Sequence, residues 1–248
     1  MTGQDEPSLT KPRRFYRTVD VAQVEGGYAL RLDGRMPKSP QKAPLVAPTE
    51  ALARLLAEEW DAQTTEIDTA RMPAVRLAFT AIDRVAVVRD AMAEEIASFG
   101  GADVICYLAD SPADLAEAEA IVWGPWIDWA ERRLGVSLVP VRGVIHRPQP
   151  EAALGRLRSL ARAEDDFSLA GLAFGAALFG SAILAFAVRL GDLSAVDAFE
   201  ISRFDEAFQA RRWGLDEEAE RRRDAMATEA VMLGRWFAAL RCDGSDGG

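Results

Sequence analysis

A run of charged side chains at 216–223 is the first place where this sequence could bind another molecule. Its acids are Asp216, Glu217, Glu218 and Glu220, and its bases are Arg221, Arg222 and Arg223. On a helix, Glu217 lies one turn before Arg221 and Glu218 one turn before Arg222, so each acid faces a base. Pairs of this kind at a protein surface contribute little. Spacing alone therefore predicts a solvated helix face.

Two further residues could carry acid–base or nucleophilic chemistry. His146, the single histidine, lies in an extended segment flanked by Arg and Pro, with no Ser, Cys or carboxylate partner nearby in the sequence. Cys106 lies in the apolar segment DVICYLA, which favours a buried thiol with a raised pKa. We therefore expect a surface histidine and a packed cysteine.

Metal, cofactor and nucleotide chemistry lack their usual residues. One histidine excludes sites with two or more imidazoles, and Cys106 and Cys242 form no CxxC pair, so we expect no metal and a reducing compartment. Neither a phosphate loop nor a GxGxxG or GxSxG motif occurs, which predicts no cofactor and no small-molecule substrate. One enzymatic alternative remains open, a carboxylate-dependent enzyme, because two acids could converge in a cleft.

Composition narrows the class of protein. The 248 residues are 49% hydrophobic and 27% charged, which is typical of a soluble globular protein. The net charge of −10 would repel a phosphate backbone, so nucleic-acid binding is not expected. The first residues hold Asp5 and Glu6 and no apolar stretch, unlike a secretory or transit peptide. We expect a cytoplasmic protein.

The N-terminal part predicts a small antiparallel sheet and one helix. Apolar residues alternate in 15–24 and 28–33, with Gly26-Gly27 as a hairpin turn between them. Thr49 is placed to cap a helix whose Leu52, Leu55, Leu56 and Trp60 form one apolar face. These elements predict an N-terminal β-rich α+β domain at 1–70.

Helices dominate after residue 70 and predict a larger all-helical domain at 71–248. An apolar stripe runs from Val75 to Phe99, and Ser111-Pro112-Ala113-Asp114 resembles a capping box before a helix ending near Gly135. Gly124-Pro125 should kink that helix, whose three Trp residues at 123, 126 and 129 are typical of a core stripe. An extended stretch at 138–146 precedes helices at about 150–162, 167–190, 194–222 and 224–241. The predicted fold class is α+β.

An uncharged run of 22 residues, 167–188, leaves a second alternative, a helical membrane-associated protein. The run is long enough to cross a bilayer and contains the pair Gly171 and Gly175 at GxxxG spacing. However, it is rich in Ala and Gly, has no Trp or Tyr at either end, and is flanked by acids rather than a basic cluster. The pattern favours a buried central helix without stable membrane insertion.

Six segments follow one another in the order found in one family, and together they run from Phe15 to Arg222. They are RRFYRTVDV, GGYALRLDGRMPKSP, LAEEWDAQ, MPAVRLAFTAIDRV, DVICYLA and FQARRWGLDEEAERR. In this order the chain resembles the ATP synthase assembly chaperones that act on the alpha subunit of the catalytic sector. The resemblance implies a small α+β domain, a helical domain and no catalysis. It also implies a bacterial member that binds the unassembled alpha subunit until the beta subunit replaces it.

The resemblance also assigns residues. It implies partner binding at the WGxxE segment, where Gly214 could break the helix and present an acid beside an aromatic anchor; the residues are Trp213, Gly214, Asp216 and Glu217. It implies structural motif positions at Asp33, Gly34, Arg35, Trp60, Pro73 and Asp83. The chain departs from the family pattern at Arg211, where the family has an acid, and at Gly124, where it has an aspartate.

Overall fold

The sheet forms one end of the molecule, and the predicted hairpin turns one residue earlier than expected. A computed structural model describes residues 11–143, 147–214 and 217–241. β1 (Val19–Val24) and β2 (Gly27–Leu32) pair antiparallel with Val21 opposite Leu30, and the short β3 (Val46–Ala47) completes the order β1-β2-β3. Val24 pairs with Gly27, so the two turn residues are Glu25 and Gly26; Gly26 and Gly27 both have positive φ, which glycine adopts readily. The predicted hairpin is confirmed.

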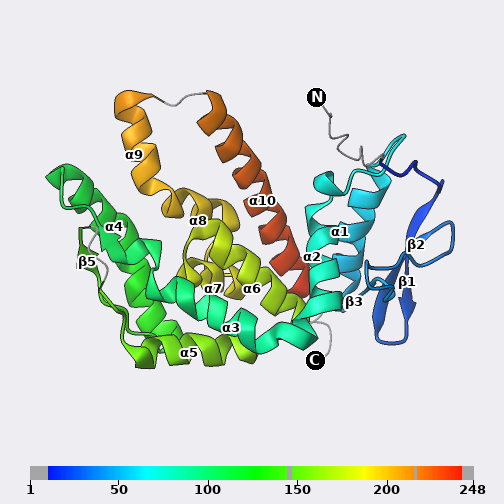
Figure 1. Cartoon of the computed structure of the whole chain (residues 1–248), viewed down its shortest axis with the longest axis horizontal. Helices are drawn as coiled ribbons and strands as arrows, with labels where there is room; N and C mark the ends of the chain where they lie inside the picture. Colours follow the sequence, from blue (N-terminus) through cyan, green and yellow to red (C-terminus); the bar gives the residue numbers. More distant parts are fainter. Residues whose placement is uncertain (1–10, 144–146, 215–216, 242–248) are drawn as a thin grey trace, which may run out of the picture.

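Helix α1 (Glu50–Asp61) connects this sheet to the helices. The Thr49 hydroxyl accepts a hydrogen bond from the Leu52 N–H at 3.0 Å and donates one to the Ala239 carbonyl at 2.9 Å. The apolar stripe of α1 is buried as predicted and lies against the sheet. Figure 1 shows α1 and α2 between the sheet and the last turns of α10. The boundary at residue 70 stays a prediction.

The next part of the chain holds the helices α2 to α5 and a second sheet of two short strands. A 3-10 turn (Thr69–Arg71) leads to α2 (Pro73–Thr80), and a π-helical turn (Ala81–Val85) connects α2 to α3 (Ala86–Gly101). A second 3-10 turn (Val104–Cys106) precedes β4 (Tyr107–Leu108), which pairs in parallel with β5 (Val141–Arg142). Between them lie α4 (Ala113–Trp129) and a π-helical turn (Ala130–Leu134), and α5 (Glu151–Arg162) follows.

The capping box predicted at 111–114 is wrong. The N-cap of α4 is Pro112, which has no side-chain cap, and the Asp114 carboxylate accepts from the Leu115 N–H rather than reaching back. Pro125 lies inside α4, and the helix continues past it to Trp129. Trp123 is 1% exposed, and its indole N–H donates to the Ile201 carbonyl at 2.9 Å, so the first tryptophan of the stripe belongs to the core.

The uncharged run folds as two buried helices, not as one. α6 (Asp166–Phe179) ends at Gly180, whose φ of +63° is left-handed, and Ser181 caps α7 (Ala182–Leu190). The predicted single helix at 167–190 is therefore wrong in length but right in burial. A Cβ on Gly171 would lie 2.8 Å from the Phe237 ring, so the small residues let α10 pack closely on α6. None of the helices in the described residues is long and apolar enough to cross a membrane.

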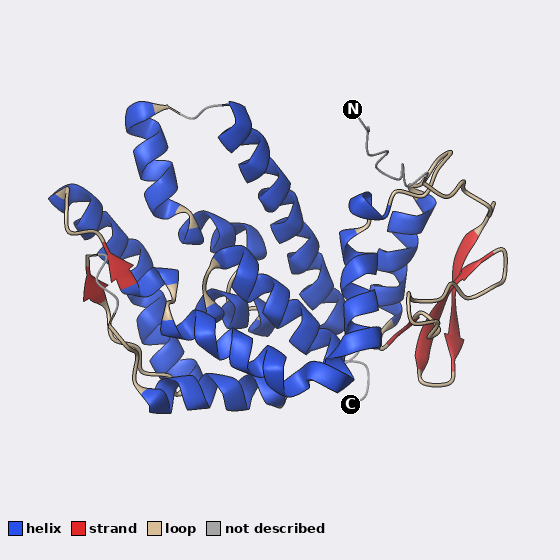
Figure 2. Cartoon of the chain, viewed as in Figure 1, coloured by secondary structure: helices blue, strands red, loops and turns tan. Residues whose placement is uncertain are grey.

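The last third of the chain also divides differently from the prediction. α8 (Ala195–Ser202), α9 (Phe204–Trp213) and α10 (Glu217–Arg241) replace the expected helices at 194–222 and 224–241. α9 and the first half of α10 both project from the body in the same direction (Figure 1), and we call them the α9–α10 arm, residues 204–214 and 217–226. Helices make up most of the described chain, and the strands lie at two opposite ends of the molecule (Figure 2). The predicted α+β class is confirmed.

Candidate partner-binding site

The tip of the α9–α10 arm depends on one glycine. Gly214 has φ +79° and ψ 167°, a conformation that only glycine adopts readily, and its N–H donates to the Ala210 carbonyl at 2.8 Å. This geometry ends α9 at Trp213 and redirects the chain before α10 begins at Glu217. The helix break that the sequence placed at Gly214 is present. Asp216 and the side chains of Trp213 and Arg211 lie outside the described part of the chain.

Glu217 is the most exposed member of any ion pair in the described residues. Its side chain is 91% exposed and lies 3.5 Å from Arg221, which is itself 71% exposed. Three acids lie in the first turn of α10, where the positive end of the helix dipole stabilises negative charge. This stabilisation does not occupy the carboxylate oxygens, which can still accept hydrogen bonds. The Glu217 carboxylate is therefore available to a partner.

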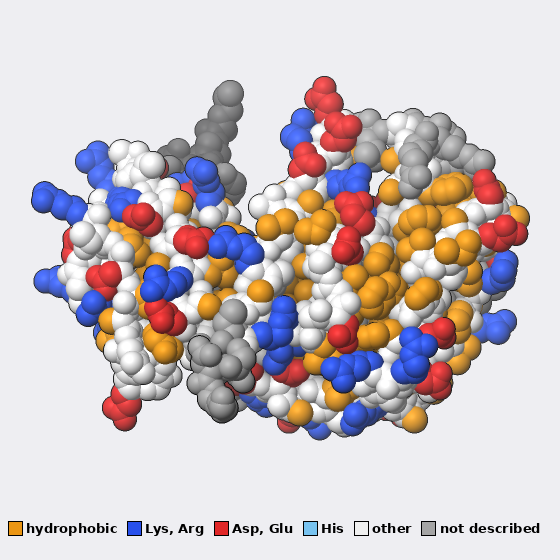
Figure 3. Space-filling view, turned by 180° about the vertical axis from the view of Figure 1, so that it is seen from behind, with side chains coloured by type: hydrophobic (Ala, Val, Ile, Leu, Met, Phe, Trp, Pro, Cys, Tyr) orange, Lys and Arg blue, Asp and Glu red, His pale blue; other side chains and the backbone are white. Residues whose placement is uncertain are grey.

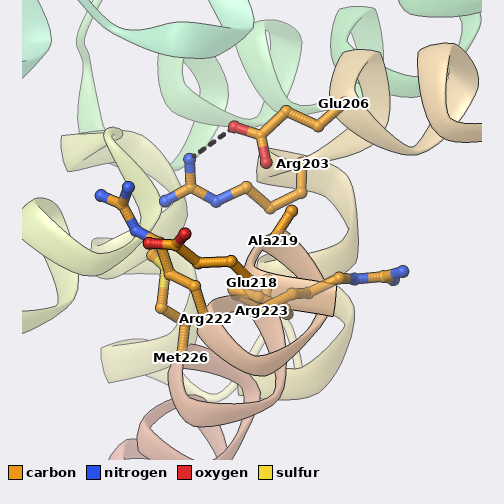
Figure 4. A pocket seen from close by; sticks show the side chains of 8 residues that line it. Arg203, Glu206, Glu218, Ala219, Arg222, Arg223 and Met226 are labelled. Carbon is orange, nitrogen blue, oxygen red and sulfur yellow. Dashed lines mark hydrogen bonds and ion pairs between the residues drawn. The ribbon is translucent and has the colours of Figure 1, made fainter. Parts of the chain in front are cut away.

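A pocket of about 460 Å³ lies below this tip, between α8, α9 and the first turns of α10. Figure 4 shows its walls: Arg203 and Glu206 come from the α9 side, and Glu218, Arg222 and Arg223 come from α10. Phe199 and Met226 add apolar surface. The pocket thus combines apolar surface with arginine and glutamate side chains, which suits a polypeptide segment bearing both apolar and charged groups.

Arg203 is the fixed group of this pocket. One guanidinium nitrogen contacts Glu206 at 3.1 Å and another donates to the Leu178 carbonyl at 3.0 Å, whereas its Nε is buried without a partner in the described residues. Arg223 forms a second pair with both carboxylate oxygens of Glu200, at 3.0 and 2.7 Å. Because Arg203 begins α9 and is bonded to the end of α6, it holds the arm to the body.

A second pocket, of about 590 Å³, lies on the other side of α9, against α4. Glu119 and Asp205 both line it, which is the convergence of acids that a carboxylate-dependent enzyme requires. However, Glu119 is 1% exposed and its carboxylate accepts the Ala109 N–H at 2.6 Å, while Asp205 accepts from the Gln209 amide at 2.8 Å. Burial raises the pKa of Glu119, and the negative charge of Asp205 raises it further. Sequence spacing gave no signal for this pair, because Glu119 lies on α4 and Asp205 on α9, far apart in the chain.

The motif carboxylates at the other end of the molecule bind backbone N–H groups of this same chain. Asp33 accepts from the N–H groups of Arg17 at 3.0 Å and Thr18 at 2.9 Å, and these contacts lower its pKa. Asp83 accepts from the Gln41 N–H at 3.0 Å and from the Ser39 hydroxyl. Gly34 and Arg35 continue the turn that Asp33 begins, and Arg35 exchanges two backbone hydrogen bonds with Leu32.

Glu59 also binds backbone N–H groups of this chain, a role that the sequence analysis did not predict. Its two carboxylate oxygens accept the N–H groups of Ala74 at 2.9 Å and Val75 at 2.8 Å, at the start of the helix that Pro73 opens. Burial raises the pKa of Glu59, although these two donors act in the opposite direction. Pro73 could have predicted this contact, because a helix that begins at a proline still leaves its next N–H groups without partners in the helix.

Trp60 lies beside Glu59 and faces inward. Its side chain is 8% exposed and meets the Tyr16 ring edge to face at 5.7 Å, while the Tyr16 hydroxyl donates to the Trp60 carbonyl at 2.6 Å. The indole Nε1 has no hydrogen-bond partner within the described residues. Trp60 is thus surrounded by the core of the sheet end and cannot reach a partner without unfolding.

The thiol candidate offers no site. Cys106 is fully buried, and burial raises the pKa of its thiol, as the apolar neighbours predicted. The nearby Asp103 is also fully buried; it accepts the Ile183 N–H at 3.2 Å, and its pKa is raised to about 7 by burial. His146 and Cys242 lie outside the described residues. Within the described ranges, no group of three His, Cys, Asp or Glu side chains could hold a metal ion.

Comparison with known proteins identifies the family. Residues 13–131 match the family model described as ATP12 chaperone protein. The crystal structure of Atp12 from Paracoccus denitrificans is 42% identical, with a TM-score of 0.86 over 93% of this chain and 99% of that one. A protein from Agrobacterium tumefaciens is 39% identical, with a TM-score of 0.86 over 93% of this chain and 87% of its own. The mitochondrial protein atp12 of Schizosaccharomyces pombe is 25% identical over 237 residues, 89% of this chain and 81% of that protein. The chain therefore belongs to the ATP12 chaperone family, as its sequence motifs indicate.

Proposed function

We propose that this chain binds the unassembled alpha subunit of the F-type ATP synthase catalytic sector and keeps it from aggregating until it pairs with the beta subunit. Membership of the ATP12 chaperone family supports the class of function. A subunit that buries apolar surface in an assembly exposes that surface when alone, and a temporary partner protects it. The proposal places this work in the bacterial cytoplasm, because the similar solved structures come from bacteria.

The observation that carries the proposed contact is the exposed Glu217 at the tip of the arm. On the face seen in Figure 3, acidic side chains crowd the start of α10 and apolar side chains gather on the helical body beside it. A carboxylate so placed can engage an arginine or backbone amides of the alpha subunit. Trp213, Gly214 and Asp216 complete the proposed contact, with Gly214 setting its direction.

The two interpretations of Glu217 differ in magnitude. As an exposed partner of Arg221 it contributes about 0.2–0.5 kcal/mol to the helix, and nothing else depends on it. As a contact in a protein interface, its removal costs about 2 kcal/mol or more of binding free energy. A binding measurement therefore separates the two roles where a stability measurement cannot.

The proposal includes no catalysis, metal or cofactor, and release follows from competition by the beta subunit rather than from turnover. Purified protein should show no nucleotide hydrolysis above background and no micromolar binding of ATP by calorimetry. Either signal would contradict this part of the proposal. The acids at 119 and 205 provide the variant for a broader check: if any hydrolytic activity is found and Glu119→Gln removes it, the carboxylate-dependent enzyme is the correct alternative.

The test of the contact is co-expression of the alpha subunit with chaperone variants. Glu217→Lys should keep the melting temperature and circular dichroism of the wild type but should fail to keep the alpha subunit in the supernatant. Glu220→Lys is the matched control, because it makes the same charge change in the same first turn on another exposed residue. It should protect the alpha subunit as well as the wild type does.

Two results would contradict the proposal. If the wild type itself gives no protection, this chain does not act on the alpha subunit. If Glu217→Lys and Glu220→Lys protect equally well, Glu217 is a solvated helix charge and the contact lies elsewhere.

A further inference from the structure

The sheet end carries the opposite charge from the rest of the chain. Residues 11–48 hold eight Lys or Arg and three Asp or Glu, although the whole chain has a net charge of −10, and all three lysines of the protein lie here. Five of these cations, Arg13, Arg17, Arg35, Lys38 and Lys42, are exposed and form no ion pair in the part of the chain that the structure describes. Basic side chains project from this end in Figure 3. The sheet end therefore presents a free positive surface on an acidic protein.

A pocket of about 490 Å³ opens within this basic surface. Its lining residues are Phe15, Tyr16, Leu32, Asp33, Arg35, Met36 and Pro37. Phe15 is 71% exposed and Met36 44%, which makes them two of the seven large hydrophobic side chains that stand exposed in the described residues. An aromatic ring and a thioether left in water at one pocket indicate a surface that gains free energy when another apolar group covers it.

Positive charge surrounds this apolar surface. Arg35 lines the pocket, and Arg17 is joined through its backbone N–H to Asp33, which lines it as well. Asp33 is the single acid of the lining, and it already accepts from two N–H groups and the Thr18 hydroxyl, so its charge is held within the turn. A ligand entering here meets apolar contacts and unpaired guanidinium groups together.

From this combination we infer that the Phe15–Met36 pocket is a second docking site for the client polypeptide, and that it takes an acidic segment bearing an apolar side chain. The inference rests on the proposed function for the identity of the client. Charge complementarity selects an acidic segment and repels the basic segments that the acidic remainder of the chain would attract. With Glu217 at the other end, the molecule would hold its client at two places of opposite charge.

Two contacts on one client have a consequence for affinity. Binding at one site raises the local concentration of the client at the other, so weak contacts combine into a tighter complex without new contacts. Each contact can still open singly, which suits a chaperone that must give up its client to an assembly partner. The two sites also discriminate, because a segment of the wrong charge is repelled at each end.

The pocket is tested first with peptides on the full chain. The probe is a fluorescent, end-blocked peptide of sequence DELFED, and the matched control is KRLFKR. The acidic peptide should bind, more weakly as salt rises, and the basic one should not. Phe15→Ala and Arg35→Glu should each weaken binding about tenfold or more at unchanged melting temperature, since both side chains are exposed. Lys42→Glu, an equal charge change in the same end but outside the pocket lining, should change binding less than twofold.

Three outcomes would overturn the inference. Equal binding of both peptides would show a merely sticky surface, and equal losses for Arg35→Glu and Lys42→Glu would show an unlocalised charge effect. The third concerns residues 1–10, which hold Asp5 and Glu6. If only a variant lacking these residues binds the acidic peptide, the chain's own N-terminal segment is the occupant and the client is not.

A crosslinking experiment with the alpha subunit separates this inference from the proposed function. The photo-reactive amino acid p-benzoylphenylalanine replaces Phe15, or Val87 on α3 as the exposed control, in complexes with the alpha subunit. Crosslinks from position 15, but not from 87, should map by mass spectrometry to an acidic segment of the alpha subunit. If the complex forms and position 15 gives no crosslink, the pocket is wrong while the proposed function stands. If wild-type chaperone forms no complex at all, the proposed function fails, and the peptide experiment still decides what the pocket binds.

Discussion

The sheet end and the α9–α10 arm both carry motif acids, and they use them in opposite ways. At the sheet end, Asp33, Glu59 and Asp83 each accept backbone N–H groups of the same chain. On the arm, Glu217 is 91% exposed and its described partner is one arginine at 3.5 Å. A motif acid is therefore a candidate for partner binding only where the backbone has not already engaged it. The contrast shows a structural role for the acids at the sheet end and supports the recognition role that we propose for Glu217.

The largest effect should come from the core of the sheet end. Trp60→Arg would place an unpaired charge where an aromatic ring is buried beside Tyr16, and we expect a loss of about 3–5 kcal/mol in the free energy of unfolding. That is much of the stability of an ordinary domain. The measurement is urea unfolding, together with the soluble fraction after expression.

Trp60→Phe is the matched control for that experiment. It keeps an aromatic ring and removes an indole N–H that has no partner among the described residues, so the cost should stay below about 1.5 kcal/mol. A Trp60→Arg protein that melts like the wild type but no longer binds the alpha subunit would reverse the comparison, since Trp60 would then be a contact residue and not a core residue.

The next effect should appear as a pH dependence in the helical body. Asp103 is fully buried and its pKa is raised to about 7, so between about pH 4 and pH 7 the folded chain holds a proton that the unfolded chain has released. Its contribution to stability is therefore largest at low pH and is lost as the pH rises towards 7. The loss can reach at most about 1.4 kcal/mol for each pH unit.

Asp103→Asn isolates this contribution, because asparagine resembles the protonated acid and does not titrate. The melting temperature of the wild type should fall more than that of Asp103→Asn between pH 5 and pH 7. Parallel curves would mean that Asp103 ionises in the folded chain as an ordinary aspartate does. The contrast with Asp33 is direct: its lowered pKa should favour the fold above the ordinary aspartate range, and this effect should be lost as the pH falls below that range through the lowered pKa.

Sequence reasoning succeeded where local geometry decides the structure. Gly26 marked the hairpin turn, the leucines before Trp60 set the buried face of α1, and Gly214 marked the break before α10. It failed where a distant contact decides. The chain leaves the helix at Arg203 without a Gly or Pro, since the Arg203 guanidinium is bonded to the Leu178 carbonyl 25 residues away. Glu59 likewise gained its role from a helix that begins only at Pro73.

Length was the misleading signal in the uncharged run. Twenty-two uncharged residues resemble a membrane span, yet Gly180 divides them. A glycine inside such a run gives no sign of whether it ends a helix or lets a neighbouring helix approach. Gly180 does the first and Gly171 the second. Only the position of α10 distinguishes them, and sequence periodicity does not contain it.

Gly171→Val should therefore cost less than Trp60→Arg but remain measurable. A Cβ at this position would lie 2.8 Å from the Phe237 ring and 2.9 Å from the Trp236 nitrogen, so the core must shift, at about 1–3 kcal/mol. Gly155→Ala is the control, also inside a helix, α5, where a Cβ would meet only the end of the Arg158 side chain at 3.8 Å. It should stabilise the protein by about 0.5–1 kcal/mol in urea unfolding. A loss at both positions would mean that the close approach of α10 is not the cause.

The smallest global effect, and the sharpest for the comparison, should follow Gly214→Ala. Gly214 is exposed, and a Cβ there meets nothing, so its φ of +79° is the only obstacle to alanine. Strain at a projecting tip can be relieved by fraying the last turn of α9 and the first turn of α10, without unfolding the body. We therefore expect a change below about 1 kcal/mol in global unfolding, faster amide hydrogen exchange confined to the arm, and weaker protection of the alpha subunit. Unchanged exchange with full protection would show that the direction set by Gly214 is irrelevant to binding, whereas a large loss of global stability would show that the arm is part of the core and not a recognition element attached to it.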